Sequence, residues 1–469
     1  MNDMAAPNAT QTLASYAARL DVGKLPGDVV RQSKILLFDT IAILLASSTR
    51  EAVNAALRAM PPSGRGQCTI VGHGSGAAPE LAAFINGIGG HDIELDDSHS
   101  PSRTHAAAVI VPTALAAAEV NKNCSGADLL AGIIAAYEVQ ARVSKAMGVQ
   151  AQFDHGFHPT TVCGTIGAGV CAGRILGLTP EKMAFAIGLA TSQSCGLMTF
   201  EEDESHMLKS FHTGVAARNG MTAALLAAHD YKSSPDALTG THNVLSPFGG
   251  DAVDFARLTE ELGVRFEICG TSIKRHACCG QTHSAVDSLL ALMKERAISW
   301  KQIERVDVEL AHKALPVVDN NPLWTHNIQY VLALAAHQGY VGVQHFSPEW
   351  TGNREIAELA RKVHAKGNDR LQKRFPVKKA AIVTVTAGNR TYTRELDSPI
   401  GNPDAPLAPS DLRAKFMSLA TEVLSEQDAE ALWTFLSPID QAPDLNSLFP
   451  LLGQKPKSPL ASAKARAAS

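Results

Sequence analysis

Residues 160–178 read TTVCGTIGAGVCAGRILGL, and this stretch decides the fold class of the chain. Its apolar residues recur at the spacing of three to four that is typical of a helix. Small residues recur along the same stretch, at Gly164, Gly167, Ala168, Ala172 and Gly173. Because small side chains let two helices approach closely, we expect a helix that packs tightly against other helices.

The sequence on either side of this stretch shows the same helical spacing. We expect a turn at 25–27 within the helical pattern of 12–48, and further helices at 79–90, 109–119, 127–147, 180–197 and 213–229. Thr179 and Pro180 form a helix-start signature, with threonine as the N-cap and proline in the first turn. The first half of the chain is therefore predicted to be a helical domain.

The pattern changes near residue 264. Alternating apolar residues predict strands at 264–268 and 306–310, and a hairpin of strands at 380–386 and 392–396. Further helices are expected at 282–296, 329–338 and 355–364. Strands mixed with helices indicate a smaller α+β domain at 265–400. After a proline-rich connector, another helix is predicted to begin near Ser410, and the tail at 453–469 is predicted to be disordered.

Composition excludes several classes of protein. The chain has 469 residues, of which 45% are hydrophobic and 19% charged, with a net charge of −4. It lacks the basic surface of a nucleic-acid-binding protein, and its N-terminus does not resemble a signal peptide. Its longest apolar run is too short for a membrane span. We therefore expect a cytoplasmic protein, in which the eight scattered cysteines, which lack metal-ligand spacing, would be reduced thiols.

The strongest indication of chemistry is the segment His91–His105, HDIELDDSHSPSRTH. It contains three histidines and four carboxylates, and an alanine-rich apolar stretch follows it. Ionisable groups next to a core are costly unless they are paired or used. The segment therefore predicts one edge of a polar pocket.

Other ionisable residues occur in four short windows, around His158, at Lys209 and His212, at 274–283, and at 326–330. Lysine and arginine neutralise carboxylates, and histidine transfers protons near neutral pH. Together these windows suggest a site for a di- or tricarboxylate.

The individual signals also have simpler explanations. Most histidines lie on surfaces or cap helices, and Asp96 and Asp97 could cap a helix. His91, Asp96 and His99 could bind a metal ion, but the sequence has no recognised ligand spacing around them. The residues alone therefore predict a polyanion-binding helical protein with possible acid–base chemistry.

Four blocks of the sequence resemble the MmgE/PrpD family. HDIELDDSH with THAAAVIVPTALAAAE is similar to the family's H-x-x-D-[FL]-D-D-[TS] segment and the helix after it, and GFHPTTVCGTIGAGVCAGRILGL to its GFHPTGTLG helix. LKSFHTGVAARNGMTAALLA and KRHACCGQTHSAVD resemble its K-x-x-H-x-G and K-x-[YW]-P-x-C-x-x-T-H blocks. The blocks occur in family order and cover the chain to about residue 430.

The resemblance implies a mainly α fold with a large all-helical domain and a smaller α+β lid domain. The helical domain would comprise 1–264 and a C-terminal helix within 401–452, with the lid at 265–400. The resemblance also implies a homodimer that uses no cofactor and no metal. The known activities of the family are 2-methylcitrate dehydration, cis-aconitate decarboxylation and iminodisuccinate epimerisation, each of which moves a proton at the carbon next to a carboxylate.

Residues transfer from the family by position. The resemblance implies catalytic roles for five residues: His105, His158, Lys209, Lys274 and Tyr330. We also predict that five residues bind substrate or orient a histidine: Glu94, Asp97, Ser98, His276 and His283. The lysines would hold carboxylates and stabilise developing negative charge, while the histidines and the tyrosine would exchange protons.

The chain departs from the family pattern at three places. Glu94 replaces an aspartate, Ala106 and Ala107 replace Pro-Ser, and His276 with Ala277 replaces an aromatic residue and a proline. We expect a lyase or isomerase acting on a small polycarboxylate, first a 2-methylcitrate-dehydratase-like enzyme, because HNIQY at 326–330 resembles that branch. A cis-aconitate-type decarboxylase or an iminodisuccinate-type epimerase is the alternative, and a non-catalytic polycarboxylate-binding protein is the alternative of another class.

Overall fold

The computed structural model describes residues 8–203, 205, 207–375 and 377–456. The described residues form two units that are interleaved in sequence. Of the described residues, unit 1 comprises those within 8–92, 96–271 and 409–456, and unit 2 those within 93–95 and 272–408. The tail that we predicted to be disordered is 453–469, and its residues 457–469 lie outside the described part of the chain.

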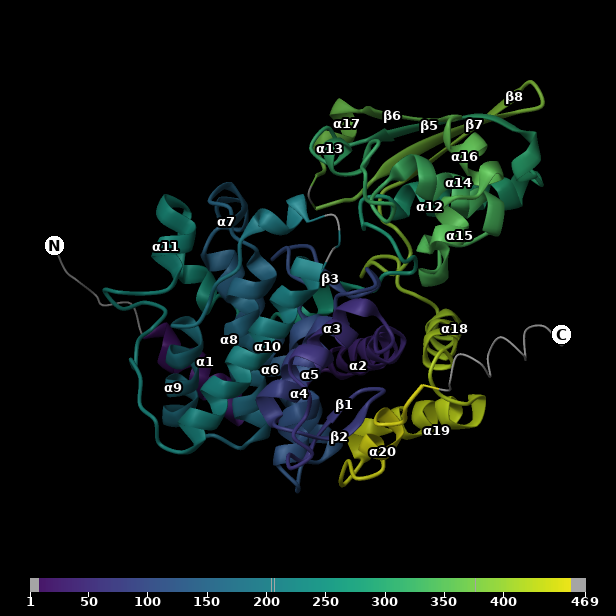
Figure 1. Ribbon diagram of the computed structural model, residues 1–469. Coiled ribbons are helices and arrows are strands. Elements are labelled where there is room, and N and C mark those ends of the chain that lie inside the picture. The colour runs from purple at the N-terminus through teal and green to yellow at the C-terminus, as the bar shows by residue number, and fades with distance from the viewer. Residues whose placement is uncertain (1–7, 204, 206, 376, 457–469) are drawn as a thin grey trace. The chain divides into compact units, whose positions relative to one another are not determined.

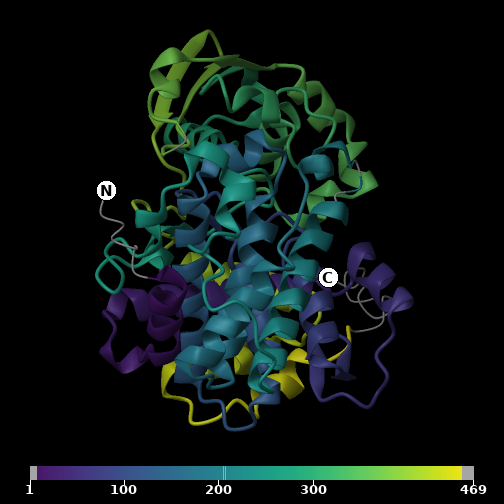
Figure 2. The same ribbon diagram turned by 90° about the vertical axis from the view of Figure 1, so that its left-hand side faces the viewer.

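Unit 1 is built mainly from helices (Figures 1 and 2). Before the unit 2 insertion they are α1 (Ala9–Arg19), α2 (Gly27–Ser47), α3 (Glu51–Ala59), α4 (Pro79–Gly89), α5 (Ala107–Val120), α6 (Gly126–Ala146), α7 (Val149–Asp154), α8 (Pro159–Ile175), α9 (Pro180–Thr191), α10 (Met207–Ala228) and α11 (Leu245–Gly249). After it they are α18 (Pro409–Ala420), α19 (Glu426–Leu436) and α20 (Leu448–Leu452). The mainly α fold class is confirmed.

Helix α8 lies at the centre of this packing, against α6, α9 and α10. All of its residues except Arg174 are buried. Its contact with α10 depends on Gly220, a residue of α10. A Cβ there would lie 2.3 Å from the Cβ of Ala168 and 2.5 Å from the backbone nitrogen of Gly169, both on α8. The small residues of 160–178 therefore do what the sequence predicts, and let two helix backbones meet.

Local signals set the helix ends. The side chain of Thr179 accepts a hydrogen bond from the Lys182 N–H, and Pro180 occupies the first turn of α9, as predicted. The C-terminal helices of unit 1 pack on α2 through aromatic rings. Phe38 stacks on Trp433 with centroids 4.8 Å apart and meets Phe416 edge-on at 6.3 Å.

Short strands accompany the helices of unit 1. Strands β1 (Cys68–Ile70) and β2 (Gly74–Ala77) form an antiparallel hairpin that we did not predict from the sequence. Its turn uses Gly72 at φ 75° and Gly74 at φ 94°, a region that glycine enters at little cost. Strand β3 is Ser98–His99, and β4 is Thr271–Ser272, at the point where the chain leaves unit 1.

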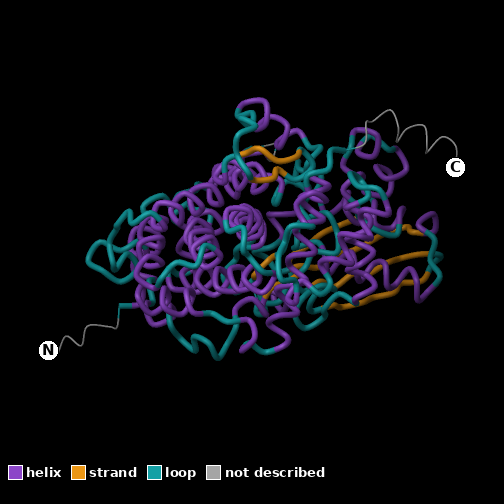
Figure 3. The backbone as a smooth tube through the Cα atoms, turned by 90° about the horizontal axis from the view of Figure 1, so that it is seen from below, coloured by secondary structure: helices purple, strands orange, loops and turns teal. Residues whose placement is uncertain are grey.

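Unit 2 is an α+β structure with one four-stranded sheet (Figure 3). Its strands are β5 (Ile303–Leu310), β6 (Val363–Gly367), β7 (Ala381–Ala387) and β8 (Arg390–Leu396). Its helices are α12 (His283–Arg296), α13 (Leu315–Val318), α14 (Ile328–Gln338), α15 (Pro348–Thr351), α16 (Arg354–Ala360) and α17 (Asp369–Gln372). The strand order is β6-β5-β7-β8.

Strand β7 at the centre of this sheet alternates buried and half-buried residues, whereas β8 at its edge has no buried residue. Strand β5 pairs in parallel with β6 and antiparallel with β7, and β7 pairs antiparallel with β8. Val383 and Val385 on β7 are buried in one apolar core with Leu289 of α12 and Leu332 of α14. The sheet thus buries one face under helices, and the predicted hairpin of β7 and β8 is confirmed.

Three local predictions were wrong. Residues 264–268 are not a strand, because Val264 is exposed in a turn and a 3₁₀ helix, η5, spans Glu267–Gly270. The helix predicted at 355–364 ends at Ala360, since Val363 pairs with Val306 to begin β6. The helix predicted at 180–197 ends at Thr191.

None of the described helices is both long enough and apolar enough to span a bilayer.

Candidate active site

The segment His91–His105 brings two imidazoles to one carboxylate in unit 1. Asp96 Oδ2 lies 2.8 Å from Nδ1 of His91 and 2.8 Å from Nδ1 of His105. His91 and Asp96 are buried, whereas the His105 side chain is 22% exposed. The two rings lie 4.8 Å apart. Two histidines therefore share one negative charge, and His105 is the more accessible of the two.

The oxygens around these rings determine where the ring protons lie. His105 Nδ1 is also 2.7 Å from the backbone oxygen of Asp97, so it faces two acceptors and must carry a proton. His91 Nδ1 likewise donates to Asp96. In the neutral state each ring then has its lone pair on Nε2. The Nε2 atom of His91 is buried and has no hydrogen-bond partner.

Two further histidines extend this group. His158 is the N-cap residue of α8, and its Nδ1 lies 3.2 Å from Nδ1 of His212 on α10. The His158 ring stacks at 6.4 Å on His91, and Phe200 packs against it at 4.7 Å. We call the four residues His91, His105, His158 and His212, with Asp96, the histidine cluster.

Burial keeps most of the cluster neutral. It lowers the pKa of His91 to about 4, despite the opposing charge of Asp96. It also lowers the pKa of His158 well below its usual value, and the neighbouring His91 and His212 add to this effect. Burial lowers the pKa of His212 as well. At pH 7 these imidazoles are therefore neutral, and each keeps one ring nitrogen with a lone pair.

Lys209 supplies positive charge to the same place. It lies on α10 one turn before His212 and is buried. Its charge contributes to the lowered pKa of both His91 and His158, and its spacing from His212 puts the two side chains on one face of α10. A buried ammonium beside neutral imidazoles can hold a substrate carboxylate and stabilise negative charge on an adjacent carbon.

Asp97 supports the cluster through its backbone and its carboxylate. Its Oδ2 accepts the Tyr137 hydroxyl at 2.8 Å, and its Oδ1 accepts the N–H of Ala107 at the start of α5 at 3.0 Å. Burial, with the charge of Asp96, raises its pKa to about 8. The carboxylate is thus occupied by the fold, and the backbone oxygen orients His105. Ser98 follows in β3 and is half-buried.

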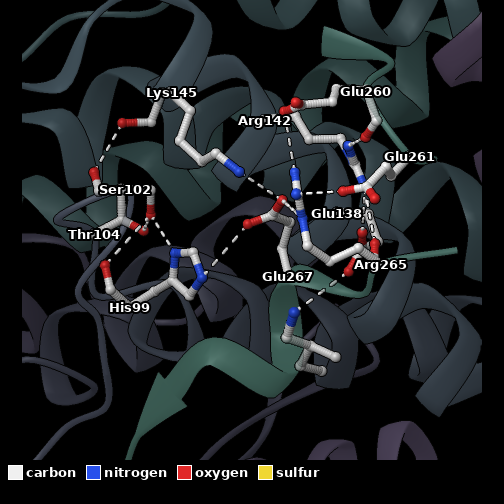
Figure 4. Close-up of polar contacts among 12 residues, drawn as sticks. His99, Ser102, Thr104, Glu138, Arg142, Lys145, Glu260, Glu261, Arg265 and Glu267 are labelled. Atoms are coloured by element: carbon white, nitrogen blue, oxygen red, sulfur yellow. Dashed lines mark hydrogen bonds and ion pairs between the residues drawn. The ribbon is translucent and has the colours of Figure 1, made fainter. Parts of the chain in front are cut away.

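The third histidine of the segment, His99, belongs to a different set of contacts (Figure 4). Its Nδ1 lies 2.7 Å from Ser102 Oγ, and its Nε2 lies 3.7 Å from Glu267, which also binds Lys145 at 2.7 Å. Burial lowers the pKa of His99 to about 4. Figure 4 shows these residues beside Arg142, so His99 joins a buried structural network.

Three of the cluster residues could also hold a metal ion. One ligand atom each of His91, Asp96 and His105 lies within 4.8 Å of the others. Both Nδ1 atoms already face Asp96, so a metal ion would have to replace these interactions. The donor set of two imidazoles and a carboxylate suits zinc or a similar ion.

Unit 2 contains a second group of predicted residues. Lys274 Nζ lies 3.2 Å from Glu94 Oε2, and both side chains are buried. Glu94 adopts φ 54°, a left-handed conformation that costs a non-glycine residue about 1–2 kcal/mol. Backbone strain of this kind concentrates at functional positions. The structure thus pairs two residues that lie 180 positions apart in the sequence.

His276 and His283 lie beside each other in unit 2, with rings 5.5 Å apart. His276 Nε2 donates to Asp287 at 3.2 Å, and its Nδ1 is buried without a hydrogen-bond partner. His283 Nε2 lies 3.1 Å from the backbone oxygen of Cys278. Burial lowers the pKa of His283 to about 3, and His276 adds to this effect.

Tyr330 is placed differently from the other predicted residues of unit 2. It lies on α14, and its hydroxyl donates to the backbone oxygen of His345 at 2.6 Å. Burial raises its pKa to about 12. Its ring meets Trp324 edge-on at 4.9 Å and lies within the apolar core of the unit. The hydroxyl proton is thus engaged by the backbone.

Sequence reasoning did not select His91, Asp96 or His212 as site residues. His91 and Asp96 belong to the dense segment already singled out, but nothing in the sequence shows that one carboxylate serves two rings. His212 lies three residues after Lys209, which puts both side chains on one face of a helix. That spacing was the available signal.

Comparisons with known proteins agree with the resemblance seen in the sequence. The model of the MmgE/PrpD N-terminal domain matches residues 11–255, and that of the MmgE/PrpD C-terminal domain matches residues 276–440. The chain is similar to a cis-aconitate decarboxylase of Aspergillus terreus, with 27% identity over 96% of this chain and 97% of that protein. It is also similar to the cis-aconitate decarboxylases of Mus musculus and Homo sapiens, with 26% identity. These alignments cover 95% and 94% of this chain and 93% and 94% of those proteins.

The two domain models match successive parts of one chain, and the alignments to these relatives run nearly end to end. The chain belongs to the MmgE/PrpD family and is an enzyme of that type, a lyase or an epimerase.

Proposed function

We propose that this enzyme is a lyase that needs no cofactor and acts on a small polycarboxylate by moving a proton at the carbon next to a carboxylate. The observation that carries the proposal is the sharing of Asp96 Oδ2 by His91 and His105. A carboxylate behind an imidazole fixes its tautomer and stabilises its cation, as in other acid–base pairs. His105 is the more accessible ring of the pair, so we assign the proton transfer to its Nε2 atom.

The two lysines have separate roles in this proposal. Lys209 lies with the histidine cluster and would stabilise the negative charge that develops at the reacting carbon. Lys274, which pairs with Glu94 within unit 2, stays a predicted carboxylate-binding residue. His158 stays neutral and would accept or pass on a proton. His276 and Ser98 remain candidates for contacts that select the substrate.

Among the reactions of this kind, we propose decarboxylation of a cis-aconitate-like tricarboxylate. The similarity over almost the whole chain to proteins named cis-aconitate decarboxylases supports it over dehydration of 2-methylcitrate. In this reaction the bond to a departing carboxylate breaks and its electron pair forms a new double bond. The electrons of the existing double bond then take up a proton at a carbon that bears another carboxylate, and His105 would donate that proton.

The test offers the purified protein cis-aconitate, 2-methylcitrate and iminodisuccinate separately and identifies the products by proton NMR. We expect methylenesuccinate from cis-aconitate. Lys209→Ala should lower its formation by at least about 100-fold, because the charge stabilisation is lost. Lys122→Ala is the matched control, since Lys122 is exposed on the surface of unit 1. An alkene from 2-methylcitrate alone would overturn the decarboxylase assignment, and full activity of Lys209→Ala would overturn the site.

A further inference from the structure

Three side chains of the histidine cluster bring metal-ligating atoms together at one point of unit 1. One ligand atom each of His91, Asp96 and His105 lies within 4.8 Å of the other two. Asp96 Oδ2 is 2.8 Å from Nδ1 of both rings. Zinc accepts a set of two imidazoles and a carboxylate, with its fourth position left to water or another ligand. The three side chains are therefore close to the arrangement of a zinc centre.

A small movement would turn these hydrogen bonds into metal bonds. Zinc holds imidazole nitrogens and carboxylate oxygens at about 2.0–2.2 Å, so two ligands of one tetrahedral ion lie about 3.3 Å apart. The separation of Asp96 Oδ2 from each Nδ1 therefore has to grow from 2.8 Å by about half an ångström. His91 follows the end of α4 and His105 precedes the start of α5, so a helix anchors each end of the segment that carries the three ligands.

The ring protons have a place to go when a metal ion binds Nδ1. Each proton then moves to Nε2 of the same ring. The Nε2 atom of His91 is buried and has no hydrogen-bond partner among the described residues, so this move breaks no bond at that atom. His105 gives up the contact of its Nδ1 with the backbone oxygen of Asp97. Because the His105 side chain is 22% exposed, the ion can reach the site from solvent past this ring.

The charges at the site oppose each other. Asp96 supplies a negative charge, and its side chain is 1% exposed, so a bound ion would be shielded from water. The positive charge of Lys209, which contributes to the lowered pKa of His91, opposes a second cation. We therefore expect weaker binding than at a structural zinc site, and an ion that chelators remove.

We propose that His91, Asp96 and His105 form a reversible binding site for zinc or a similar divalent transition-metal ion, and that the bound ion inhibits the enzyme. The ion takes the Asp96 carboxylate and Nδ1 of His105, so that ring holds its proton on Nε2. To donate this proton His105 would have to become an imidazolate, which is unfavourable near neutral pH. Proton transfer therefore stops until the ion leaves. The inhibition rests on the proposed function, whereas the binding does not.

Binding is tested without substrate. The full-length protein is freed of metal with a chelator, kept reduced with a phosphine, and titrated first with Co²⁺ and then with Zn²⁺. We expect one Co²⁺ ion per chain, with the visible absorption of a tetrahedral site that has nitrogen and oxygen ligands, and its displacement by Zn²⁺. No uptake of either ion overturns the proposal. A near-ultraviolet charge-transfer band from thiolate ligands, without the expected visible bands, equally overturns it.

Variants assign the bound ion to these residues. His91→Ala and Asp96→Asn should each weaken Zn²⁺ binding by at least about tenfold, because each removes one of three protein ligands. His312→Ala is the matched control, since His312 pairs with Asp369 at the exposed surface of unit 2. Equal Zn²⁺ affinity of the wild type and both site variants overturns the site. The Co²⁺ spectrum of the wild type decides the question even where a variant does not fold.

The inhibition is measured as methylenesuccinate formation from cis-aconitate at fixed concentrations of free Zn²⁺. The rate should fall at least about tenfold as the site fills, with the same dependence on Zn²⁺ as the binding curve, and EDTA should restore it. Full activity with the site filled overturns the inhibitory role. If no product forms with or without Zn²⁺, the proposed function fails, while the metal site stays supported by the uptake of one ion and its loss in the variants.

Discussion

Asp96 and His105 meet at 2.8 Å, through Oδ2 and Nδ1, while a backbone oxygen holds the same nitrogen from another direction. This geometry fixes the ring with its proton on Nδ1 and leaves Nε2 for chemistry. The second ring on Asp96, His91, is buried and neutral near pH 7, so the carboxylate charge is available to a proton on His105. The relationship between these residues is the basis of the first prediction.

Asp96→Asn should lower kcat by about 100-fold or more, because it keeps the shape of the side chain and removes the charge that supports His105. The melting temperature should change much less than kcat. Asp230→Asn is the matched control, since Asp230 pairs with Lys182 at the exposed surface of the same unit. Steady-state rates and melting curves for both variants provide the measurement, and equal effects of the two substitutions would contradict this role.

The lowered pKa of His91 predicts how stability depends on pH. In the unfolded chain this histidine binds a proton below about pH 6.5, whereas in the folded chain it does so only below about 4. The unfolded state therefore binds more protons in this window, and folding stability falls as pH drops from about 6.5 toward 4. At pH 5 the loss attributable to His91 is about 2 kcal/mol.

His91→Gln should remove that part of the acid sensitivity while the other buried histidines keep theirs. Melting temperatures at pH 7.5, 6.5, 5.5 and 5.0 give the comparison. We expect a smaller decrease for the variant than for the wild type. A parallel decrease in both proteins would show that His91 does not remain neutral in the folded state.

The left-handed backbone at Glu94 predicts an unusual order of stabilities. Glu94→Gly and Glu94→Ala both remove the partner of Lys274, but only glycine adopts φ 54° without strain. The glycine variant should therefore be more stable by about 1 kcal/mol. At Glu51, in the first turn of α3, the same two substitutions should show the opposite order. Scanning calorimetry measures both pairs, and an alanine preference at position 94 would refute the strain.

Tyr330→Phe should act on stability more than on turnover. The substitution removes the hydroxyl that binds the His345 backbone oxygen, and leaving that oxygen unpaired costs about 1–3 kcal/mol. Because the hydroxyl proton is already engaged, kcat should change by less than about threefold. Calorimetry and steady-state kinetics on one preparation give both values. A large loss of kcat with unchanged stability would contradict this expectation and support a role for Tyr330 in proton transfer.

Local signals in the sequence were sufficient for many elements of the fold. Thr179 and Pro180 marked the start of α9, and the alternation of β7 and β8 marked their hairpin. Tertiary contacts overrode the pattern at 264–268, where Glu267 enters a buried ion-pair network and the chain turns instead of extending. Strand β6 was missed because its short, polar sequence acquires strand geometry only by pairing with β5.

The candidate site was predictable as a set of residues but not as an arrangement. The density of ionisable groups at 91–105 pointed to the segment, yet the contacts of Asp96 with two rings depend on how the chain bends between them. The pairing of Glu94 with Lys274 spans 180 positions, and no spacing rule connects such distant residues. Burial decides which histidines remain neutral, and only the folded structure shows burial.

The most direct test of the account is the reaction of cis-aconitate in D2O, followed by NMR with wild-type enzyme and Asp96→Asn. We predict methylenesuccinate that carries one deuterium at the carbon next to a carboxylate, formed rapidly by the wild type and at least about 100-fold more slowly by the variant. Product without deuterium, or equal rates for the two proteins, would contradict proton transfer through the Asp96–His105 pair.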